Sequence, residues 1–267
     1  MKYKLFISDF DWTLGLAPDK IEPETVSAIK EYEKKGGKFV ICTGRSYPTI
    51  KCVCEKYGLG GLIVCFQGAL GMEIETDKVV FDGGMDKQNA VDIILDLLDE
   101  GVEIGVYIDN LFHYEKKGEG IETYERLVGA NGKKVDDLIK LVKETDKPIR
   151  KVLTIQEPKL KDLLIKKYSK KYEGKLIFNA SSECFLEIID PKWSKGNGVK
   201  RIAEYYNVPL SEVIAVGDSL NDLELIRGEW HGVIVGDGME AVKKYAKEIT
   251  VPFNEQPIKH LLEKYCL

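Results

Sequence analysis

The fold class is indicated first by LFISDFDWT, residues 5–13, in which a short apolar run leads into two carboxylates. The run at 5–8 is typical of a strand that is covered on both faces of a parallel sheet. An extended backbone points residues i and i+2 to the same side, so Asp9 and Asp11 are expected to meet at the C-terminal edge of that sheet. Open α/β sheets bind their ligands at this edge. Taken alone, the pattern also fits a strand-end turn that Asp11 caps.

Similar apolar runs recur toward both ends of the chain, with helix-like segments between them. The expected strands are 39–42, 62–65, 213–216 and 232–235, and the expected helices are 24–35, 198–206, one from Asn221, 239–247 and 256–264. Strands that alternate with helices predict a parallel sheet. We therefore expect the two ends to form one α/β domain, a Rossmann-like core with a doubly wound parallel sheet.

The middle of the chain has a different pattern, because hairpins occur there among the helices. The expected strands are 103–108, 111–116, 151–155, 175–179 and 184–189, and the expected helices are 87–98, 119–127, 136–142 and 159–172. This mixture predicts an α+β domain with an antiparallel sheet. Clusters of Gly and Pro place that domain at 84–189, inserted into a core made of 1–83 and 190–267.

Charge and composition argue against several classes of function. The 267 residues carry a net charge of −5 with the signs mixed along the chain, so nucleic-acid binding is not expected as the main activity. The chain has no apolar run of about 18 residues, the length that a membrane span needs. Its six cysteines form no CxxC pair, which favours reduced thiols. We expect a cytoplasmic protein with neither membrane nor nucleic-acid partners, and the sequence leaves its oligomeric state open.

A second acidic cluster, GDSLND at 217–222, follows the apolar run at 213–216. If a helix begins near Ser219, Asp218 and Asp222 lie four positions apart on one face of its first turn. Two carboxylates there suit a hard cation such as Mg²⁺, which binds carboxylate, phosphate and water oxygens. The competing interpretation is that Asp218 or Ser219 caps the helix, and this interpretation gives Asp222 no role.

Two further motifs supply groups that match a phosphate. Thr43, Gly44 and Arg45 follow the run at 39–42, so a hydroxyl, a backbone amide and a cation lie together where a helix begins. Lys195 follows the inserted domain and precedes a helix, where it can place a fixed positive charge against a transferring phosphoryl group. Each motif alone is common, as a turn or as a solvated surface charge.

The order of these four motifs resembles that of the haloacid dehalogenase (HAD) superfamily of phosphotransferases, over essentially the whole chain. The inserted α+β domain lies between the second and third motifs, as in the Cof-type subgroup. Most members of that subgroup are Mg²⁺-dependent phosphatases of sugar phosphates and other small phosphoesters. Two positions depart from the pattern, because the family usually has Gly where Trp12 stands and often has Asn where Gln67 stands. Trp12 adds bulk beside the first motif and is expected to narrow access for the substrate.

By this resemblance, Asp9 is the nucleophile that forms an aspartyl-phosphate, and Asp11 is the general acid and then the general base. The resemblance also implies a Mg²⁺ cofactor, held by the Asp9 carboxylate, the Asp11 backbone carbonyl and Asp218. Asp222 is implied as a further ligand or as support close by, and Asn221 as support for the loop.

The same resemblance gives the phosphoryl oxygens their partners, which are Thr43, the Gly44 amide and Lys195. Arg45 either helps to bind the phosphate or faces the inserted cap domain. The expected partner is thus a small phosphorylated metabolite.

Two other functions remain open at this stage. One is a phosphosugar mutase-like phosphotransferase, which moves phosphate between positions of a sugar. The other is a non-catalytic protein that binds phosphorylated metabolites on the same scaffold, and it is disfavoured because every group implied in catalysis is present. The three histidines, His113, His231 and His260, are far apart and make no metal-binding pattern.

Overall fold

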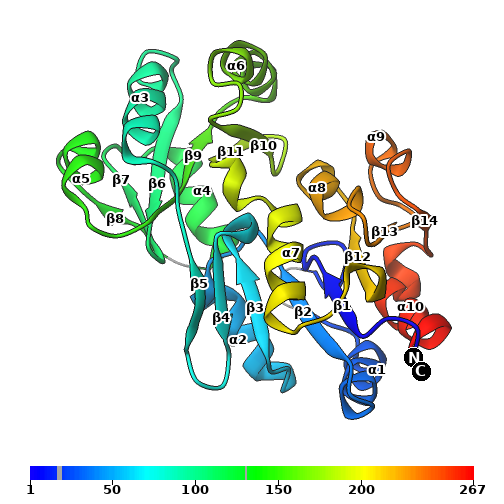
Figure 1. The fold of residues 1–267 in the computed structure, drawn as a ribbon. Helices are drawn as coiled ribbons and strands as arrows, with labels where there is room; N and C mark the ends of the chain where they lie inside the picture. The colour runs from blue at the N-terminus through cyan, green and yellow to red at the C-terminus, as the bar shows by residue number, and fades with distance from the viewer. Residues whose placement is uncertain (17–19, 130) are drawn as a thin grey trace. The chain divides into compact units, whose positions relative to one another are not determined.

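The computed structural model describes residues 1–16, 20–129 and 131–267. These residues form two compact units (Figure 1). One comprises Met1–Phe81 together with Ser194–Leu267, and the other is Asp82–Trp193. The second unit is therefore an insertion within the first. The changes of unit fall at 81/82 and 193/194, whereas the Gly and Pro clusters of the sequence suggested 83/84 and 189/190.

An eight-stranded sheet forms the centre of the first unit, in the order β14-β13-β12-β1-β2-β3-β4-β5. Its strands are β1 (Leu5–Ser8), β2 (Lys38–Cys42), β3 (Leu62–Cys65), β4 (Leu70–Glu73), β5 (Val79–Asp82), β12 (Val213–Gly217), β13 (His231–Ile234) and β14 (Glu248–Ile249). Strand β1 pairs in parallel with β2 on one side and with β12 on the other. Along the chain the sheet first grows from β1 toward β2 and β3, and later from β12 toward β13 and β14 on the other side. The carboxyl ends of β1 and β12 therefore lie at a topological switch point, where open α/β sheets bind their ligands.

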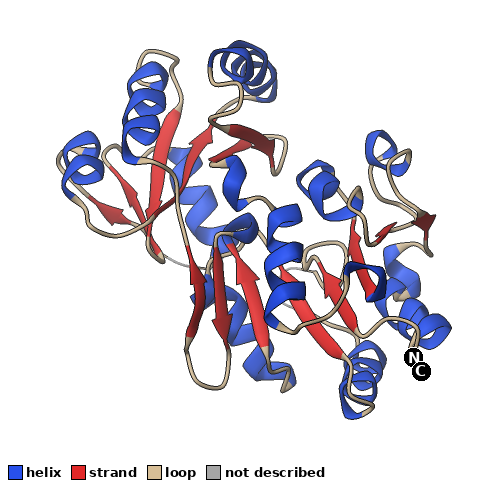
Figure 2. Ribbon diagram, viewed as in Figure 1, coloured by secondary structure: helices blue, strands red, loops and turns tan. Residues whose placement is uncertain are grey.

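Helices cover both faces of this sheet, as Figure 2 shows. They are α1 (Pro23–Lys34), α2 (Tyr47–Tyr57), α7 (Lys195–Tyr205), α8 (Leu223–Ile226), α9 (Glu240–Lys243) and α10 (Pro257–Tyr265). Alternate side chains of β1 point to opposite faces of the sheet. Ile7 packs in a core cluster with Ile202 of α7, whereas the Phe6 ring contacts Tyr32 of α1 edge to face, with the ring centroids 6.3 Å apart. Four consecutive buried residues in β1 follow from this arrangement. The predicted doubly wound α/β fold is confirmed.

The second unit is built on a separate six-stranded sheet, in the order β10-β11-β9-β6-β7-β8. Its elements are α3 (Lys87–Leu97), β6 (Glu103–Ile108), β7 (Leu111–Tyr114), α4 (Glu119–Val128), β8 (Lys133–Lys134), α5 (Leu138–Glu144), β9 (Ile149–Ile155), α6 (Pro158–Lys171), β10 (Ile177–Ala180) and β11 (Phe185–Ile189). Neighbouring strands are antiparallel except for β7 and β8. Helices α3, α5 and α6 share one apolar cluster with the sheet, for example through Ile94, Val142 and Leu164. This is the α+β insert that the sequence predicted.

Some predicted elements were wrong in extent. The helix expected at 239–247 is only α9, because the Lys247 amide already donates to the Gly232 carbonyl and leads into β14. The helix expected from Asn221 is a 3₁₀ turn, Leu220–Asp222, followed by the four residues of α8. Strands β4 and β5 were missed, since each is only four residues long and carries no clear alternation.

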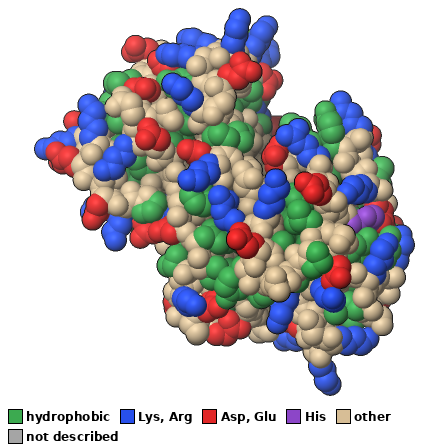
Figure 3. Space-filling model, viewed as in Figure 1, with side chains coloured by type: hydrophobic (Ala, Val, Ile, Leu, Met, Phe, Trp, Pro, Cys, Tyr) green, Lys and Arg blue, Asp and Glu red, His purple; other side chains and the backbone are tan. Residues whose placement is uncertain are grey.

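One face of the molecule has a mixed charge distribution. On the face drawn in Figure 3, Lys and Arg side chains lie among Asp and Glu side chains. Of the helices formed by residues 1–16, 20–129 and 131–267, none is long and apolar enough to cross a membrane.

Candidate active site

Asp9 lies immediately after β1, at the switch point between β1 and β12. Its amide donates to the Val216 carbonyl at 2.9 Å, which continues the parallel ladder with β12 by one residue. The Asp9 carboxylate is almost completely buried, at 4% exposure. Because the strand ladder fixes its backbone, this carboxylate has a well-defined position at the carboxyl edge of the sheet.

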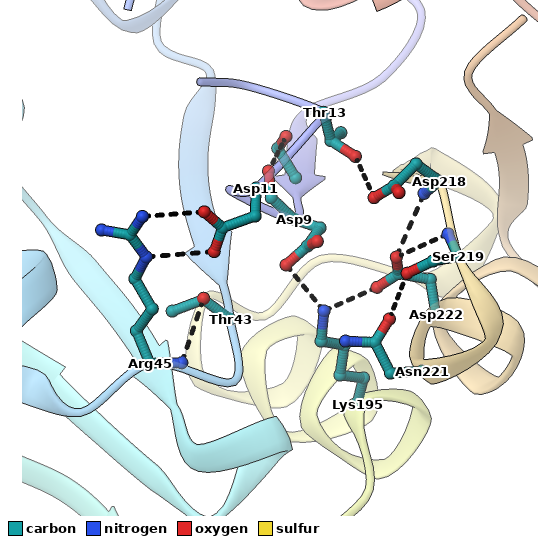
Figure 4. A network of polar contacts seen from close by, with 11 residues as sticks. Asp9, Asp11, Thr13, Thr43, Arg45, Lys195, Asp218, Ser219, Asn221 and Asp222 are labelled. Atoms are coloured by element: carbon teal, nitrogen blue, oxygen red, sulfur yellow. Dashed lines mark hydrogen bonds and ion pairs between the residues drawn. The ribbon is translucent and has the colours of Figure 1, made fainter. Parts of the chain in front are cut away.

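Lys195 provides the positive charge of the site. It is the first residue of α7, whose N-cap is the Ser194 hydroxyl, and its side chain is fully buried. The ammonium donates to Asp9 Oδ1 and to Asp222 Oδ1, both at 2.6 Å (Figure 4). The structure therefore brings this lysine to the nucleophile candidate itself, where it bridges two carboxylates that are far apart in the sequence.

Asp222 has a role that the sequence interpretation missed. The interpretation that capping leaves Asp222 unexplained was wrong, because Asp222 is the acidic half of a capping box with Ser219. Its Oδ2 accepts from the amides of Asp218 at 3.1 Å and Ser219 at 3.2 Å. A Cβ atom at Gly217 would lie 2.5 Å from the Asp222 Cβ, so glycine is what lets the carboxylate fold under this loop.

Asp218 is held from two sides. The Thr13 hydroxyl donates to its Oδ1 at 3.1 Å, and the Met239 amide donates to its backbone carbonyl at 2.8 Å. Thr13 was not singled out from the sequence, although it belongs to the first motif. Asn221 is also placed in this loop, where its Oδ1 accepts from the Ser219 hydroxyl at 2.6 Å. In the structure it therefore contacts the loop itself.

Carboxylate oxygens of Asp9, Asp218 and Asp222 all lie within 4.8 Å of one another. Burial, followed by the charge of Asp222, raises the pKa of Asp9 well above its ordinary value. The same two causes raise the pKa of Asp218 to about 7. Burial alone would lower the pKa of Lys195, but Asp222 and Asp9 outweigh it and raise that pKa. One ammonium thus faces three carboxylates, and this set of hard oxygen donors fits a divalent cation such as Mg²⁺.

Asp11 and Arg45 form a separate ion pair beside this cluster (Figure 4). Arg45 donates in bidentate fashion, from Nη2 to Asp11 Oδ1 at 2.7 Å and from Nε to Oδ2 at 3.0 Å. Its guanidinium also lies over the Phe10 ring, 4.5 Å from the centroid. The side chain of Asp11 is 44% exposed, so this carboxylate is accessible where that of Asp9 is not.

The loop after β2 carries the remaining predicted residues. Thr43 is buried, its amide donates to the Val64 carbonyl at 2.8 Å, and its hydroxyl accepts from the Arg45 amide at 3.2 Å. Gly44 lies between these two residues. The Gln67 amide donates to the Thr43 carbonyl at 3.0 Å, which ties the loop to the segment after β3.

The two departures from the family pattern fall at strained backbone positions. Trp12 has φ of 59° and Gln67 has φ of 60°, both in the left-handed region. Glycine enters this region freely, and asparagine enters it more readily than most residues. The usual Gly and Asn of the family thus match the backbone at these positions, and this chain accommodates larger side chains there.

Comparison with known proteins places the chain in a family. The family model of haloacid dehalogenase-like hydrolases matches residues 6–262. Phosphatase YwpJ of Bacillus subtilis is 26% identical over 282 residues, covering 97% of this chain and 99% of its own length. The Bacillus subtilis protein YitU, named 5-amino-6-(5-phospho-D-ribitylamino)uracil phosphatase, is 28% identical over 279 residues, covering 98% and 97%.

The fold is also similar to that of solved structures. The HAD subclass IIB sugar phosphatase BT4131 superimposes with a TM-score of 0.85 at 18% identity, over 98% of each chain. Fold and site together define a hydrolase with a buried acidic centre at the carboxyl edge of a doubly wound sheet. The chain belongs to the haloacid dehalogenase-like hydrolases, and the Cof-type resemblance inferred from its sequence is confirmed. It is a phosphoric monoester hydrolase.

Proposed function

We propose that the protein is a Mg²⁺-dependent phosphatase of sugar phosphates or related small metabolites, and that it works through an aspartyl-phosphate on Asp9. The observation that carries this proposal is the Asp9 carboxylate, buried at the end of β1, with Lys195 at 2.6 Å on one of its oxygens. We assign catalysis to the unit formed by Met1–Phe81 and Ser194–Leu267, and the role of a cap to Asp82–Trp193.

In the first chemical step, a carboxylate oxygen of Asp9 attacks phosphorus while the bond from phosphorus to the leaving oxygen breaks. We expect Oδ2 to be the attacking atom, because Oδ1 accepts the hydrogen bond from Lys195. Covalent catalysis of this kind replaces one difficult displacement with two easier ones. Water then attacks the phosphorus of the aspartyl-phosphate, which releases inorganic phosphate and restores Asp9.

Asp11 moves the protons in both steps. It donates a proton to the departing alkoxide and later removes one from the attacking water. Its exposed position beside the buried cluster suits a group that must exchange protons with substrate and water. In the structure both oxygens of the Asp11 carboxylate accept from Arg45, so Asp11 has to leave this ion pair and take up a proton before it can protonate the leaving group.

Mg²⁺ would be held by the carboxylates of Asp9 and Asp218, with the Asp11 backbone carbonyl as the further ligand that the family resemblance implies. When bound, the cation would offset the repulsion between an anionic nucleophile and an anionic phosphoryl group. We propose that Asp222 supports these ligands and does not bind the metal itself, because its two oxygens already accept from Lys195 and from two backbone amides.

The phosphoryl oxygens need partners as charge builds on them during transfer. We assign this role to the Thr43 hydroxyl, the Gly44 amide and the Lys195 ammonium. The name of the relative YitU also points to a small phosphorylated metabolite as substrate.

A screen of phosphorylated metabolites with purified protein and Mg²⁺, scored by release of inorganic phosphate, tests the proposal. We expect release from several small phosphoesters and its loss after exhaustive chelation. Full activity without divalent cations would contradict the metal assignment. Isomerised sugar phosphate without free phosphate would indicate the mutase, and binding without any turnover would indicate a non-catalytic protein.

A further inference from the structure

Three exposed apolar residues of the first unit lie in loops that contain Asp218 or contact it. Trp12 is 58% exposed, Leu220 is 42% exposed and Met239 is 48% exposed. Trp12 precedes Thr13, whose hydroxyl binds the Asp218 carboxylate at 3.1 Å. Leu220 is two residues beyond Asp218, and the Met239 amide donates to the Asp218 carbonyl at 2.8 Å. Loops after three different strands, each with one of these exposed apolar residues, therefore meet at one acidic residue.

Trp12 is the most unusual of the three. It occupies a left-handed backbone position, with φ of 59°, which bulky residues rarely adopt. Its ring meets Phe253 edge to face, with centroids 5.8 Å apart, yet more than half of the side chain remains exposed. The free energy gained by burying this side chain is therefore too small to explain why a strained backbone is tolerated here. Strain of this kind and exposed apolar patches both occur preferentially at ligand sites.

The position of Trp12 in the chain indicates which part of the substrate it would contact. It directly follows Asp11, which is accessible and is assigned to protonate the leaving oxygen. A side chain beside the acid faces the alcohol part of a phosphoester, because the phosphoryl part lies at Asp9. We propose that Trp12, Phe253, Leu220 and Met239 form an apolar rim that binds an aromatic ring in the alcohol part of the substrate. This inference rests on the proposed function and narrows its substrate class.

Two alkyl phosphates separate recognition of the ring from the chemistry. Ethyl phosphate and 2-phenylethyl phosphate both release a primary alcohol, and only the second carries a ring. We expect the Trp12→Gly variant to raise KM for 2-phenylethyl phosphate about three- to tenfold, the range that one aromatic contact provides. Its kcat should stay unchanged, as should both constants for ethyl phosphate. Trp12→Phe should retain most of the preference.

The variants are chosen so that misfolding does not imitate the effect. Glycine accepts the left-handed backbone at position 12, so Trp12→Gly relieves strain while it removes the ring. Tyr245→Ala is the matched control, because Tyr245 is an exposed aromatic residue of the same unit, at 44%, outside the apolar rim. We expect this control to behave as wild type toward both substrates.

An unchanged KM for 2-phenylethyl phosphate in Trp12→Gly would overturn the inference, as would an equal loss for both substrates. If wild type hydrolysed neither compound, the metabolite screen would still decide the proposed function, and the rim would be tested separately by binding. Calorimetry with 2-phenylethylphosphonate and ethylphosphonate should then show tighter binding of the ring-bearing compound to wild type and no such preference in Trp12→Gly. Equal affinities in wild type would reject the rim.

Discussion

The two ends of the central sheet hold charge in opposite ways. At the carboxyl end, one ammonium faces the carboxylates of Asp9, Asp218 and Asp222, and the pKa of Asp218 rises to about 7. At the amino end, the Glu248 carboxylate accepts from His231, Tyr265 and Lys264. Although burial alone would raise the pKa of Glu248, these three hydrogen bonds lower it to about 2.

On the proposed function, the difference separates a site that carries out chemistry from a site that stabilises the fold. An excess of carboxylates leaves a demand for positive charge, which a bound divalent cation can meet. An excess of donors leaves the carboxylate satisfied, and it ties β13, β14 and the last helix together. Removing a carboxylate from the first cluster should therefore cost activity, and removing one from the second should cost stability.

The largest expected effect is that of Asp9→Asn. This substitution keeps the shape of the side chain but removes the nucleophilic oxygen anion, so turnover should vanish. Because it also removes one of three mutually repelling carboxylates and leaves Lys195 paired with Asp222, the thermal midpoint should not fall. Phosphate release and calorimetric unfolding check the two halves. Normal turnover of Asp9→Asn, or a large loss of its stability, would contradict the assignment of catalysis to one end of the sheet and of stabilisation to the other.

Asp11→Asn should have the next largest effect, and a selective one. Loss of the general acid should slow alkyl phosphates by about two to four decades. It should slow p-nitrophenyl phosphate far less, because p-nitrophenolate leaves without needing a proton. Single-turnover phosphoryl transfer from both substrates is the measurement. An equal slowing of the two would show that Asp11 is not the acid.

Sequence and structure agree best where a single strand carries the information. The apolar runs of β1 and β12 led directly to Asp9 and Asp218, since a buried strand ends where polar residues begin. Contacts between distant loops could not be predicted in the same way. The bond from Thr13 to Asp218 joins positions 205 apart, and it depends on the parallel pairing of β1 with β12.

The capping role of Asp222 was missed for a different reason. The motif GDSLND contains Ser and Asp three positions apart, which is the spacing of a capping box with Asp in place of the usual Glu. That signal is present in the sequence, but the capping interpretation considered only Asp218 and Ser219 and gave Asp222 no role. The pairing of Arg45 with Asp11 had no comparable signal, because the two residues leave different strands.

A smaller effect is expected when Mg²⁺ binds the excess carboxylates. The folded protein should gain about 2.7 kcal/mol at a concentration one hundred times Kd, seen as a higher thermal midpoint. Asp218→Asn should abolish most of this gain, whereas Glu248→Gln should leave it intact. A gain that survives Asp218→Asn would place the cation elsewhere.

The smallest effect should come from Glu248→Gln, which should cost about 2 kcal/mol of stability near neutral pH without changing turnover. Because the folded pKa lies below the unfolded value of 4.5, the contribution of Glu248 is fully present above that pH. It is lost as pH falls toward 2, so the difference between variant and wild type should shrink over this window. Unfolding free energies between pH 2 and 7 provide the check. Glu240→Gln is the control and should change little, because the Glu240 side chain is 85% exposed in its ion pair with Lys243.

The measurement that tests the central claim most directly is the identity of the phosphorylated residue. The protein would be mixed with a good substrate, quenched rapidly, and treated with borohydride, which reduces an acyl phosphate to an alcohol. Peptide mass spectrometry should then find the reduced side chain at residue 9 in wild type and at no position in Asp9→Asn. A covalent phosphate on another residue, or complete turnover with no trapped side chain at residue 9, would contradict the account.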